Sequence, residues 1–359
     1  MITSQIFDPS KIDPLSSTRG GGRFIQLLRE NLNSNTEFIT TLENVQYDKT
    51  LIIPFFDPFS KPVLSKRIAR KQTIVIYDVI PLKHKDQFPV GIRGKLNVFL
   101  NKQALKHYDC VVTISECSKK DLVRYLNVRE DKIKVIYPTL SNVFKNSKLE
   151  IQNTNKNQAS TNYQPPTKYC LYVGDVNWNK NIYTLAKAIK LADVPCVFVG
   201  KAFNTLTNHV GLPENVPPEY SYQDLTHPWQ QEFKEFVKEL GRNKNFIFYG
   251  YVTDKELVDT YQKATLNLLL SRDEGFGFSY LEASSLGIPS LLSKTPVFQE
   301  IAQDAALFAD PNSPSDIAKQ IKSVWHDEKK LSDLGSKAKQ RSVVFNRSKF
   351  TAEWQSIIT

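Results

Sequence analysis

The sequence has few cysteines and no long apolar run. Its four cysteines, Cys110, Cys117, Cys170 and Cys196, form no Cys-x-x-Cys pair, and three of them lie in or beside apolar runs, where small buried residues are common. No stretch of about 18 apolar residues occurs, so no transmembrane helix is expected. Residues 1–10 lack the charged and apolar regions of a signal peptide. These absences argue against a disulfide-rich secreted protein and predict a reduced, cytoplasmic one.

Two motifs that carry chemistry in other proteins are also missing. No Asp-x-Asp pair occurs, so a divalent metal has no obvious ligand set, and we expect no metal and no cofactor. No Gly-x-Gly-x-x-Gly follows a strand-like run. Gly275-Phe276-Gly277 begins such a pattern, but Tyr280 occupies the position of its last glycine. An NAD-linked Rossmann enzyme is therefore disfavoured.

Acidic residues are scarce in the first part of the chain. The 359 residues carry a net charge of +10, and residues 1–145 hold 23 Lys and Arg against 14 Asp and Glu, whereas the remainder holds 24 against 23. A basic face attracts membrane headgroups, an acidic glycan or nucleic acid, although no nucleic-acid motif is present. A basic surface without a partner is the alternative. The length favours two domains.

The stretch 271–283 is the most informative part of the sequence. The apolar run Leu266–Leu270 leads into Gly275-Phe276-Gly277, and the helix-forming segment that follows ends at Gly287-Ile288-Pro289. A strand, a glycine turn and a helix start together direct backbone N–H groups and the positive end of the helix at an anion. This order predicts a phosphate site.

Two carboxylates, Glu274 and Glu282, lie eight residues apart in this stretch. Acids beside an anion site repel phosphate, so we expect them to accept hydrogen bonds from hydroxyl groups. Phosphate together with hydroxyls points to a sugar nucleotide. The alternative that spacing leaves open is an ordinary strand-to-helix turn with one solvated acid and one acid favoured by the helix dipole.

The Glu-x7-Glu pattern from Glu274 to Glu282 resembles the donor-site motif of the retaining glycosyltransferases of sequence family 4, and the chain is identified as a mannosyltransferase-like member of glycosyltransferase group 1. The resemblance recurs along most of the chain. It implies an α/β protein with the GT-B fold, in which two Rossmann-like parallel-sheet domains face a cleft.

Two parts of the first half share this resemblance. The glycine cluster Ser17–Arg23 precedes an amphipathic run and resembles the family's N-terminal glycine loop, so Gly22 is expected near the donor diphosphate; a flexible loop is the alternative. The strand Thr73–Asp78 ends where many family members have His-Asp. Here Tyr77 takes the histidine's place, and Asp78 is expected on the acceptor or sugar side. His84 is expected to be a solvated loop residue.

The second half carries the expected donor site. The segment from Gly174 to Asn181 resembles the family segment in which a lysine at a helix start binds the donor pyrophosphate. By this resemblance, Lys180 is the expected pyrophosphate ligand. An ammonium group there reinforces an anion site. Asp175 stands where many relatives have arginine, so the phosphate charge is expected to fall to Lys180, or to Arg272.

Composition and resemblance together predict the domain organisation. Residues 146–166 are polar and read as a flexible segment. We therefore expect an acceptor-side Rossmann-like domain at 1–150, a linker at 151–166, a donor-binding domain at 167–345 and a C-terminal helix, 346–359, that returns to the first domain.

The function predicted from the resemblance is that of a retaining, metal-independent glycosyltransferase. It would move a hexose from a nucleoside diphosphate sugar to a glycan or lipid-linked saccharide, in surface polysaccharide synthesis. Glu274 is the candidate catalytic residue, and Glu282 is expected to bind the ribose. The expected diphosphate ligands are Lys180, Arg272, Gly22, Gly275, Phe276, Gly277 and Phe278; the expected base contacts are Tyr251 and Val252.

Three rival readings stay open. A sugar-nucleotide epimerase of the GT-B fold would share the motifs, whereas a phosphorylase would need a pyridoxal phosphate lysine and a much longer chain. Tyr77 and Asp175 also leave room for a catalytically silent module that binds glycan or membrane. The expected partners are the sugar nucleotide, the saccharide acceptor and an anionic membrane surface met by the basic first half. Such a protein would act in the cytoplasm, at the inner face of the membrane.

Overall fold

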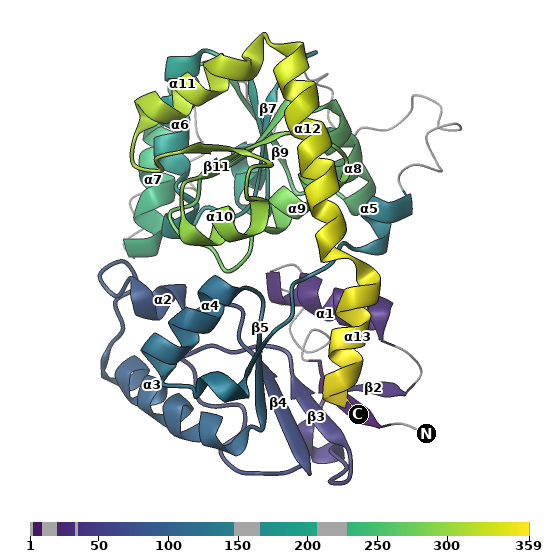
Figure 1. The fold of residues 1–359 in the computed structure, drawn as a ribbon. Helices are drawn as coiled ribbons and strands as arrows, with labels where there is room; N and C mark the ends of the chain where they lie inside the picture. The colour runs from purple at the N-terminus through teal and green to yellow at the C-terminus, as the bar shows by residue number, and fades with distance from the viewer. Residues whose placement is uncertain (1–2, 9–19, 33–34, 147–165, 207–227, 359) are drawn as a thin grey trace. The chain divides into compact units, whose positions relative to one another are not determined.

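The computed structural model describes residues 3–8, 20–32, 35–146, 166–206 and 228–358, and the chain divides into two compact units (Figure 1). Unit 1 contains residues 1–141 and 345–359, and unit 2 contains residues 142–344. Both are α/β units, each built on a six-stranded parallel sheet. Of the described residues, none lies in a helix that is both long and apolar enough to cross a membrane.

Unit 1 has the strand order β2-β1-β3-β4-β5-β6. All five strand pairings are parallel. Thr50–Ile53 shows why, because all four of its residues are buried, as happens when helices cover both faces of a parallel sheet. The strands are β1 Ser4–Phe7, β2 Thr36–Ile39, β3 Thr50–Ile53, β4 Lys71–Val75, β5 Cys110–Thr113 and β6 Ile133–Val135.

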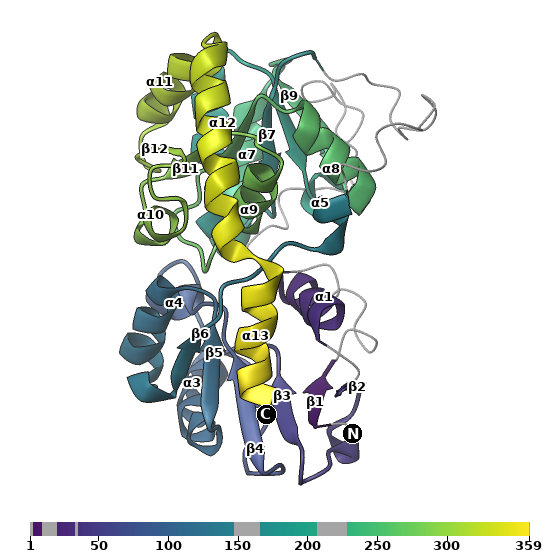
Figure 2. The same ribbon diagram turned by 45° about the vertical axis from the view of Figure 1, so that its right-hand side comes forward.

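The helices of unit 1 are α1 Gly20–Asn31, α2 Ile80–Lys83, α3 Ile92–Ala104, α4 Glu116–Asp121 and α13 Arg347–Ile358. Helix α13 returns from the end of the chain and packs beside α1, where Phe24 contacts Phe350 and Trp354 with ring centroids 6.1 Å apart (Figure 2). Helix α4 ends at Asp121, and a π-helical turn covers Leu122–Leu126. Ser115 caps α4 by accepting from the Ser118 amide.

Unit 2 has the strand order β12-β11-β10-β7-β8-β9. Helices α6, α7 and α11 enclose the large apolar core on one face of this sheet, and α9 and α12 lie on the other (Figures 1 and 2). The strands are β7 Cys170–Val173, β8 Cys196–Val199, β9 Phe246–Gly250, β10 Leu266–Leu269, β11 Ser290–Ser293 and β12 Leu307–Ala309. The helices are α5 Asn142–Asn146, α6 Ile182–Ala192, α7 Pro228–Leu240, α8 Asp254–Lys263, α9 Phe278–Ser285, α10 Pro296–Ala302, α11 Pro314–Trp325 and α12 Glu328–Ser342.

The boundary between the units lies earlier than residue 150. Residues 142–146 form α5, which packs against α8, and the Phe144 ring lies 6.0 Å from that of Tyr261. This aromatic contact ties the segment to unit 2, so the first domain ends at Ser141. The expected linker at 151–166 falls, except for Pro166, outside the described residues.

Helix α12 packs closely against α9, the helix that follows Gly277. Gly335 lies at its closest approach to the end of α9, and a Cβ atom added there would lie 2.2 Å from the carbonyl oxygen of Gly287. Only a glycine allows the two backbones to come this close. Helix α8 begins with a capping box, in which Thr253 and Glu256 bond to each other's backbone amides.

Candidate functional site

The strand order of the sheet in unit 2 reverses between the neighbouring strands β7 and β10. These adjacent strands are parallel, with Leu266 opposite Cys170 and Asn267 opposite Leu171. In open α/β sheets, ligands bind at the carboxyl ends of the strands where the order reverses. The segments that leave this point are the Gly174–Asn181 loop after β7 and the 270–277 turn after β10. These are the two segments that the sequence predicts to bind the donor.

Asn181 joins the two segments. It is fully buried, has a left-handed backbone with φ of 59°, and its Nδ2 donates to the carbonyl oxygens of Leu270 at 2.9 Å and Pro311 at 2.7 Å. Two further bonds run between the segments: the Arg272 amide donates to the Asn179 carbonyl at 2.7 Å, and Asn179 Nδ2 donates to the Asp273 carbonyl at 3.3 Å. The two loops are therefore held as one rigid element.

Lys180 and Glu274 meet across this element. Lys180 Nζ lies 2.6 Å from Glu274 Oε1, and Ser271 Oγ donates to the same oxygen at 2.7 Å. The side chains are 22% and 11% exposed, so water screens the pair only partly. Residues 94 positions apart in the chain thus place one cation and one anion side by side at the sheet's reversal point.

The glycine corner has the predicted strand, turn and helix. Gly277 is the N-cap of α9 and has φ of +111°, a backbone conformation that L-residues rarely adopt. A Cβ there would lie 2.8 Å from Phe298 Cε1 and 3.2 Å from Leu269 Cδ2. Phe276 is buried and contacts the Phe278 ring at 5.8 Å. Gly277 is therefore required to start α9 at Phe278, where the helix presents its N-terminal amides.

Glu282 lies in the second turn of α9 and is 7% exposed. Its Oε2 accepts a hydrogen bond from the hydroxyl of Tyr261 on α8 at 3.0 Å. Buried carboxylates need such partners. The Tyr261 hydroxyl thus fixes one Glu282 oxygen, a contact that the spacing of residues does not predict.

Arg272 has an internal partner. Its Nη1 lies 2.9 Å from Glu232 Oε2 and also donates to the Trp178 carbonyl, and its guanidinium lies 5.1 Å from the Trp178 ring centroid. Glu232 also accepts from the Tyr183 amide at 2.9 Å. The charge of Arg272 is thereby balanced within unit 2, as the charge of Lys180 is balanced by Glu274. Sequence reasoning missed Glu232, which lies on α7, 40 residues before Arg272.

The two residues expected to contact the base follow strand β9. Tyr251 is 59% exposed, its amide donates to Asn204 Oδ1 at 2.7 Å, and the Lys201 ammonium lies 5.3 Å from its ring centroid. Val252 follows as a half-buried loop residue. In the loop after β7, Asp175 Oδ1 accepts a hydrogen bond from the backbone amide of the next residue, Val176, at 2.9 Å.

In unit 1 the expected glycine turn is partly helical. Gly22 lies in the first turn of α1, whereas residues 17–19 fall outside the described part of the chain. β4 ends at Val75, so Asp78 lies in the loop after it, where its Oδ1 accepts from the Ile80 amide at 3.2 Å. Tyr77 donates to the Pro54 carbonyl and packs on Phe24, and burial raises the pKa of its hydroxyl. His84 caps the end of α2 through its backbone.

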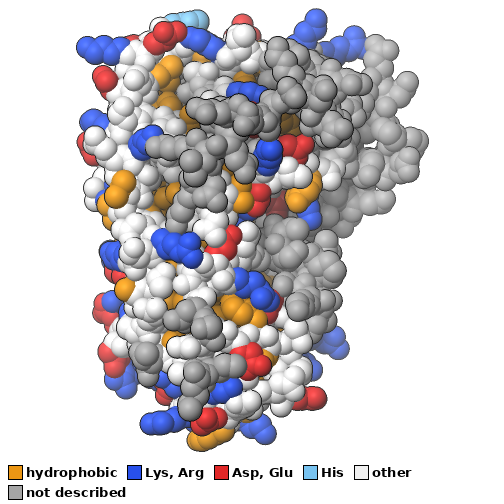
Figure 3. All heavy atoms as spheres, turned by 90° about the vertical axis from the view of Figure 1, so that its right-hand side faces the viewer, with side chains coloured by type: hydrophobic (Ala, Val, Ile, Leu, Met, Phe, Trp, Pro, Cys, Tyr) orange, Lys and Arg blue, Asp and Glu red, His pale blue; other side chains and the backbone are white. Residues whose placement is uncertain are grey.

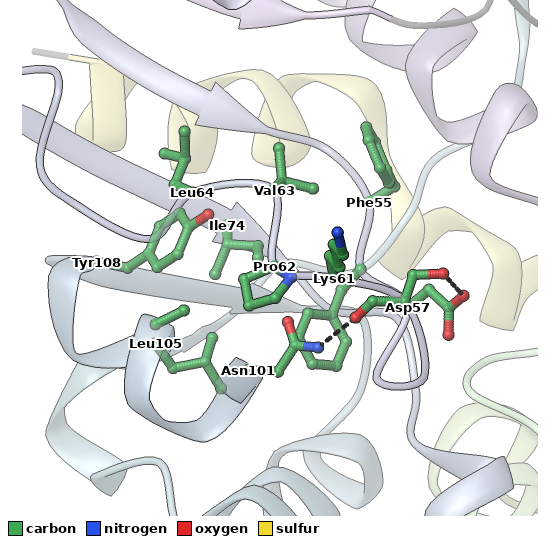
Figure 4. Close-up of a pocket in the computed structure, with 13 residues that line it drawn as sticks. Phe55, Asp57, Lys61, Pro62, Val63, Leu64, Ile74, Asn101, Leu105 and Tyr108 are labelled. Carbon is green, nitrogen blue, oxygen red and sulfur yellow. Dashed lines mark hydrogen bonds between the residues drawn. The ribbon is translucent and has the colours of Figure 1, made fainter. Parts of the chain in front are cut away.

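A pocket of about 280 Å³ lies in unit 1 and not at the Lys180–Glu274 pair (Figure 4). It is bounded by the loop 55–64, by β4 and by the end of α3, and most of its lining is apolar. The polar side chains on its rim bond one another or the backbone: Ser60 donates to Asp57 at 2.6 Å, and Asn101 donates to the Ser60 carbonyl at 2.9 Å. Within the described ranges, no three His, Cys, Asp or Glu side chains gather closely enough to hold a metal ion.

Comparison with known proteins decides the family. The model of the family "Glycosyl transferases group 1" matches residues 153–341, more than half of the chain. The chain belongs to the group 1 glycosyltransferases. The match contains the loop after β7, the glycine corner and both glutamates, so the family assignment predicted from these motifs is confirmed.

Curated relatives of this glycosyltransferase include mannosyltransferases. "Serotype-specific mannosyltransferase WbdA" of Escherichia coli is 23% identical over 316 residues, which are 85% of this chain and 36% of that protein. "O-antigen chain mannosyltransferase RfbU" of Salmonella typhimurium is 26% identical over 258 residues, which are 72% of this chain and 62% of that protein. The chain thus spans about a third of the first relative and about three fifths of the second.

Solved structures confirm the GT-B fold of this glycosyltransferase. Anabaena HepE, in a complex with UDP and glucose, superposes with a TM-score of 0.64 at 14% identity and covers 99% of both chains. WaaG, "a glycosyltransferase involved in lipopolysaccharide biosynthesis", superposes with a TM-score of 0.63 at 12% identity over the whole of both chains. At these identities the likeness extends to the fold alone.

Proposed function

We propose that this glycosyltransferase transfers a hexose, with mannose as the first candidate, from a nucleoside diphosphate sugar to a glycan or lipid-linked saccharide with retention of configuration. The acceptor class and mannose are suggested by WbdA and RfbU, whose names describe mannosyltransferases, in RfbU's case of the O-antigen chain. The observation that carries the proposal is the contact between Lys180 and Glu274 at the reversal point of the second sheet.

The reaction breaks the bond between the sugar's anomeric carbon and a phosphate oxygen. A group that stabilises the departing diphosphate and a group that holds the sugar must therefore lie next to each other. Lys180 and the amides at the start of α9 suit the phosphate, because a cation and fixed dipoles stabilise charge that grows in the transition state. Glu274 suits the sugar hydroxyls and the positive charge that develops on the ring. The 2.6 Å separation of the two side chains supports this division of roles.

The contact between Lys180 and Glu274 also implies that Lys180 changes hydrogen-bond partners when the donor binds. Without donor, the Lys180 ammonium is held by the Glu274 carboxylate, and Ser271 holds the same oxygen. When a diphosphate arrives, Lys180 shifts part of its bonding to phosphate, and the second Glu274 oxygen remains available for a hydroxyl. Ser271 keeps the carboxylate in place during this exchange, which makes it a positioning residue.

Glu282 is proposed to accept from the ribose hydroxyls. Tyr261 orients the Glu282 carboxylate through Oε2, and one carboxylate has about four acceptor positions. Tyr251 and Val252 are proposed to meet the base, Arg272 to support the diphosphate loop, Gly22 to contact the donor, and Asp78 to lie on the acceptor side. No metal or cofactor is part of the proposal.

The test is a donor screen followed by product analysis. Thermal shift with a panel of nucleoside diphosphate sugars, including mannose and glucose donors, should give stabilisation by one donor beyond that of its free diphosphate. The anomeric configuration of the product, read by NMR, should match that of the donor. Inversion would refute the retaining mechanism, and epimerised donor without transfer would favour the epimerase.

A further inference from the structure

Helix α3 in unit 1 turns apolar side chains outward. Four residues, here called the outer stripe, are exposed: Ile92 at 87%, Leu96 at 54%, Phe99 at 57% and Leu100 at 39%. Their spacing of i, i+4, i+7 and i+8 places them on one face of the helix. Single exposed apolar residues are normal on protein surfaces, but four on one face form a continuous patch.

The inward face of α3 combines amides with smaller apolar residues, since Val98 packs against the core and Ala104 is buried. Asn97 Nδ2 donates to the Phe59 carbonyl at 2.7 Å. Asn101, which is 4% exposed, donates to the Pro58 carbonyl at 3.2 Å. It also donates to the Ser60 carbonyl at 2.9 Å (Figure 4). A surface helix usually buries its large apolar residues, so a face that exposes four of them is unusual. The asparagine bonds fix its rotation, because turning the outer stripe inward would break them and leave buried polar groups unpaired.

Basic residues border the outer stripe. With about 100° between successive helical residues, Arg93 falls on one side of the stripe, and Lys95 and Lys102 fall on the other. No Asp or Glu occurs anywhere from residue 87 to residue 108. On the face drawn in Figure 3, by contrast, basic and acidic side chains are interspersed. An apolar stripe between cations matches a surface with anionic headgroups over hydrocarbon.

We propose that α3 docks on an anionic lipid surface, with the outer stripe inserted at the boundary between headgroups and acyl chains and the bordering cations among the headgroups. A second copy of the chain fits this face poorly. A two-fold contact would bring Arg93, Lys95 and Lys102 of both copies together, and four apolar residues fall well short of the roughly 20 residues a side that stable interfaces use. The contact is separate from the donor site and does not depend on the proposed function.

Sedimentation of the full chain with vesicles tests the proposal, in the absence of donor and acceptor. Binding to vesicles that contain phosphatidylglycerol should exceed binding to pure phosphatidylcholine and should fall as salt rises. The double variant Leu96→Gln/Phe99→Gln should lower the partition coefficient roughly tenfold or more. The variant Arg93→Gln/Lys95→Gln should lower it at least about fivefold on the anionic vesicles. Leu191→Gln, which removes a 52% exposed leucine on α6, is the matched control and should bind like the wild type.

Three results would overturn the proposal. One is a wild-type chain that does not sediment with anionic vesicles at low salt, and another is a stripe variant, folded by circular dichroism, that binds as well as the wild type. The third is self-association in lipid-free sedimentation velocity that the stripe variant abolishes, because the occupant would then be a second copy. Calorimetric binding of the donor to the same preparations is a separate readout, so a failure of the donor assignment is not confused with a failure of lipid binding.

Discussion

Gly277→Ala should destabilise unit 2 more than a glycine substitution that changes only the backbone. The new methyl group would lie 2.8 Å from Phe298 Cε1, where contacts of 3.4 Å or more are ordinary. A backbone with φ of +111° costs an L-residue about 1–2 kcal/mol, and forcing an extra carbon into a packed site costs about 1–3 kcal/mol. We therefore expect a loss of about 2–5 kcal/mol in the free energy of unfolding.

Gly241→Ala is the control for this prediction. Gly241 also has positive φ, +56°, but its added Cβ would meet nothing within 4 Å. The Gly241→Ala variant should lose only about 1–2 kcal/mol in the free energy of unfolding, which is the cost of the backbone conformation alone. Urea unfolding followed by circular dichroism measures both variants. If Gly277→Ala costs no more than Gly241→Ala, the contact with Phe298 does not hold the corner, and the argument for a built α9 terminus fails.

Three further predictions concern the site, the fold and pH. Glu282→Ala should weaken nucleoside diphosphate binding at least about tenfold. Tyr261→Phe should weaken it less, because only the bond that orients Glu282 is lost. Equal calorimetric affinity of the wild type and Glu282→Ala would refute the ribose role. Gly335→Ala should lower the free energy of unfolding by about 2–4 kcal/mol, although alanine favours helices, because its methyl group would meet the Gly287 carbonyl. Substitution of the exposed neighbour, Ser336→Ala, is the control. A Gly335→Ala variant more stable than the wild type would contradict the contact. The Arg67 guanidinium and the Gln72 amide hold the pKa of Asp109 below its ordinary value. That stabilisation is present above the unfolded carboxyl's pKa, near 4, and is lost as pH falls through the lower folded pKa. The stability difference between wild type and Asp109→Asn should therefore be constant at neutral pH and shrink in acid; a difference independent of pH would show that the charge is irrelevant.

The sequence was most informative where function and local structure coincide. The corner Glu274–Phe278 has its strand, positive-φ glycine and helix because glycine placement and apolar patterning are local signals. The strand order was not visible locally, so the placement of Lys180 beside Glu274 came from the family resemblance and not from periodicity. The partners Tyr261 and Glu232 are fixed by packing between distant helices, which spacing cannot show.

Elements that break the usual pattern were missed. Helix α3 is hard to predict as a core-facing helix, because its largest apolar residues are exposed whereas Asn101 is buried. Helix α12 is hard to predict because it is strongly charged and has Gly335 in its middle, and that glycine is explained by the backbone of Gly287. The boundary predicted at residue 150 differs from the observed one at Ser141, because the contact between Phe144 and Tyr261 is not visible in the sequence.

The most direct test of the central claim is calorimetry and single-turnover transfer on Lys180→Met and Glu274→Gln side by side, with the donor found by the screen. Lys180→Met should lose at least about tenfold in affinity for the free nucleoside diphosphate, whereas Glu274→Gln should bind it within about threefold of the wild type and lose transfer at least about a hundredfold. Wild-type diphosphate affinity in Lys180→Met, or wild-type transfer in Glu274→Gln, would contradict the assignment of phosphate to the ammonium and sugar to the carboxylate.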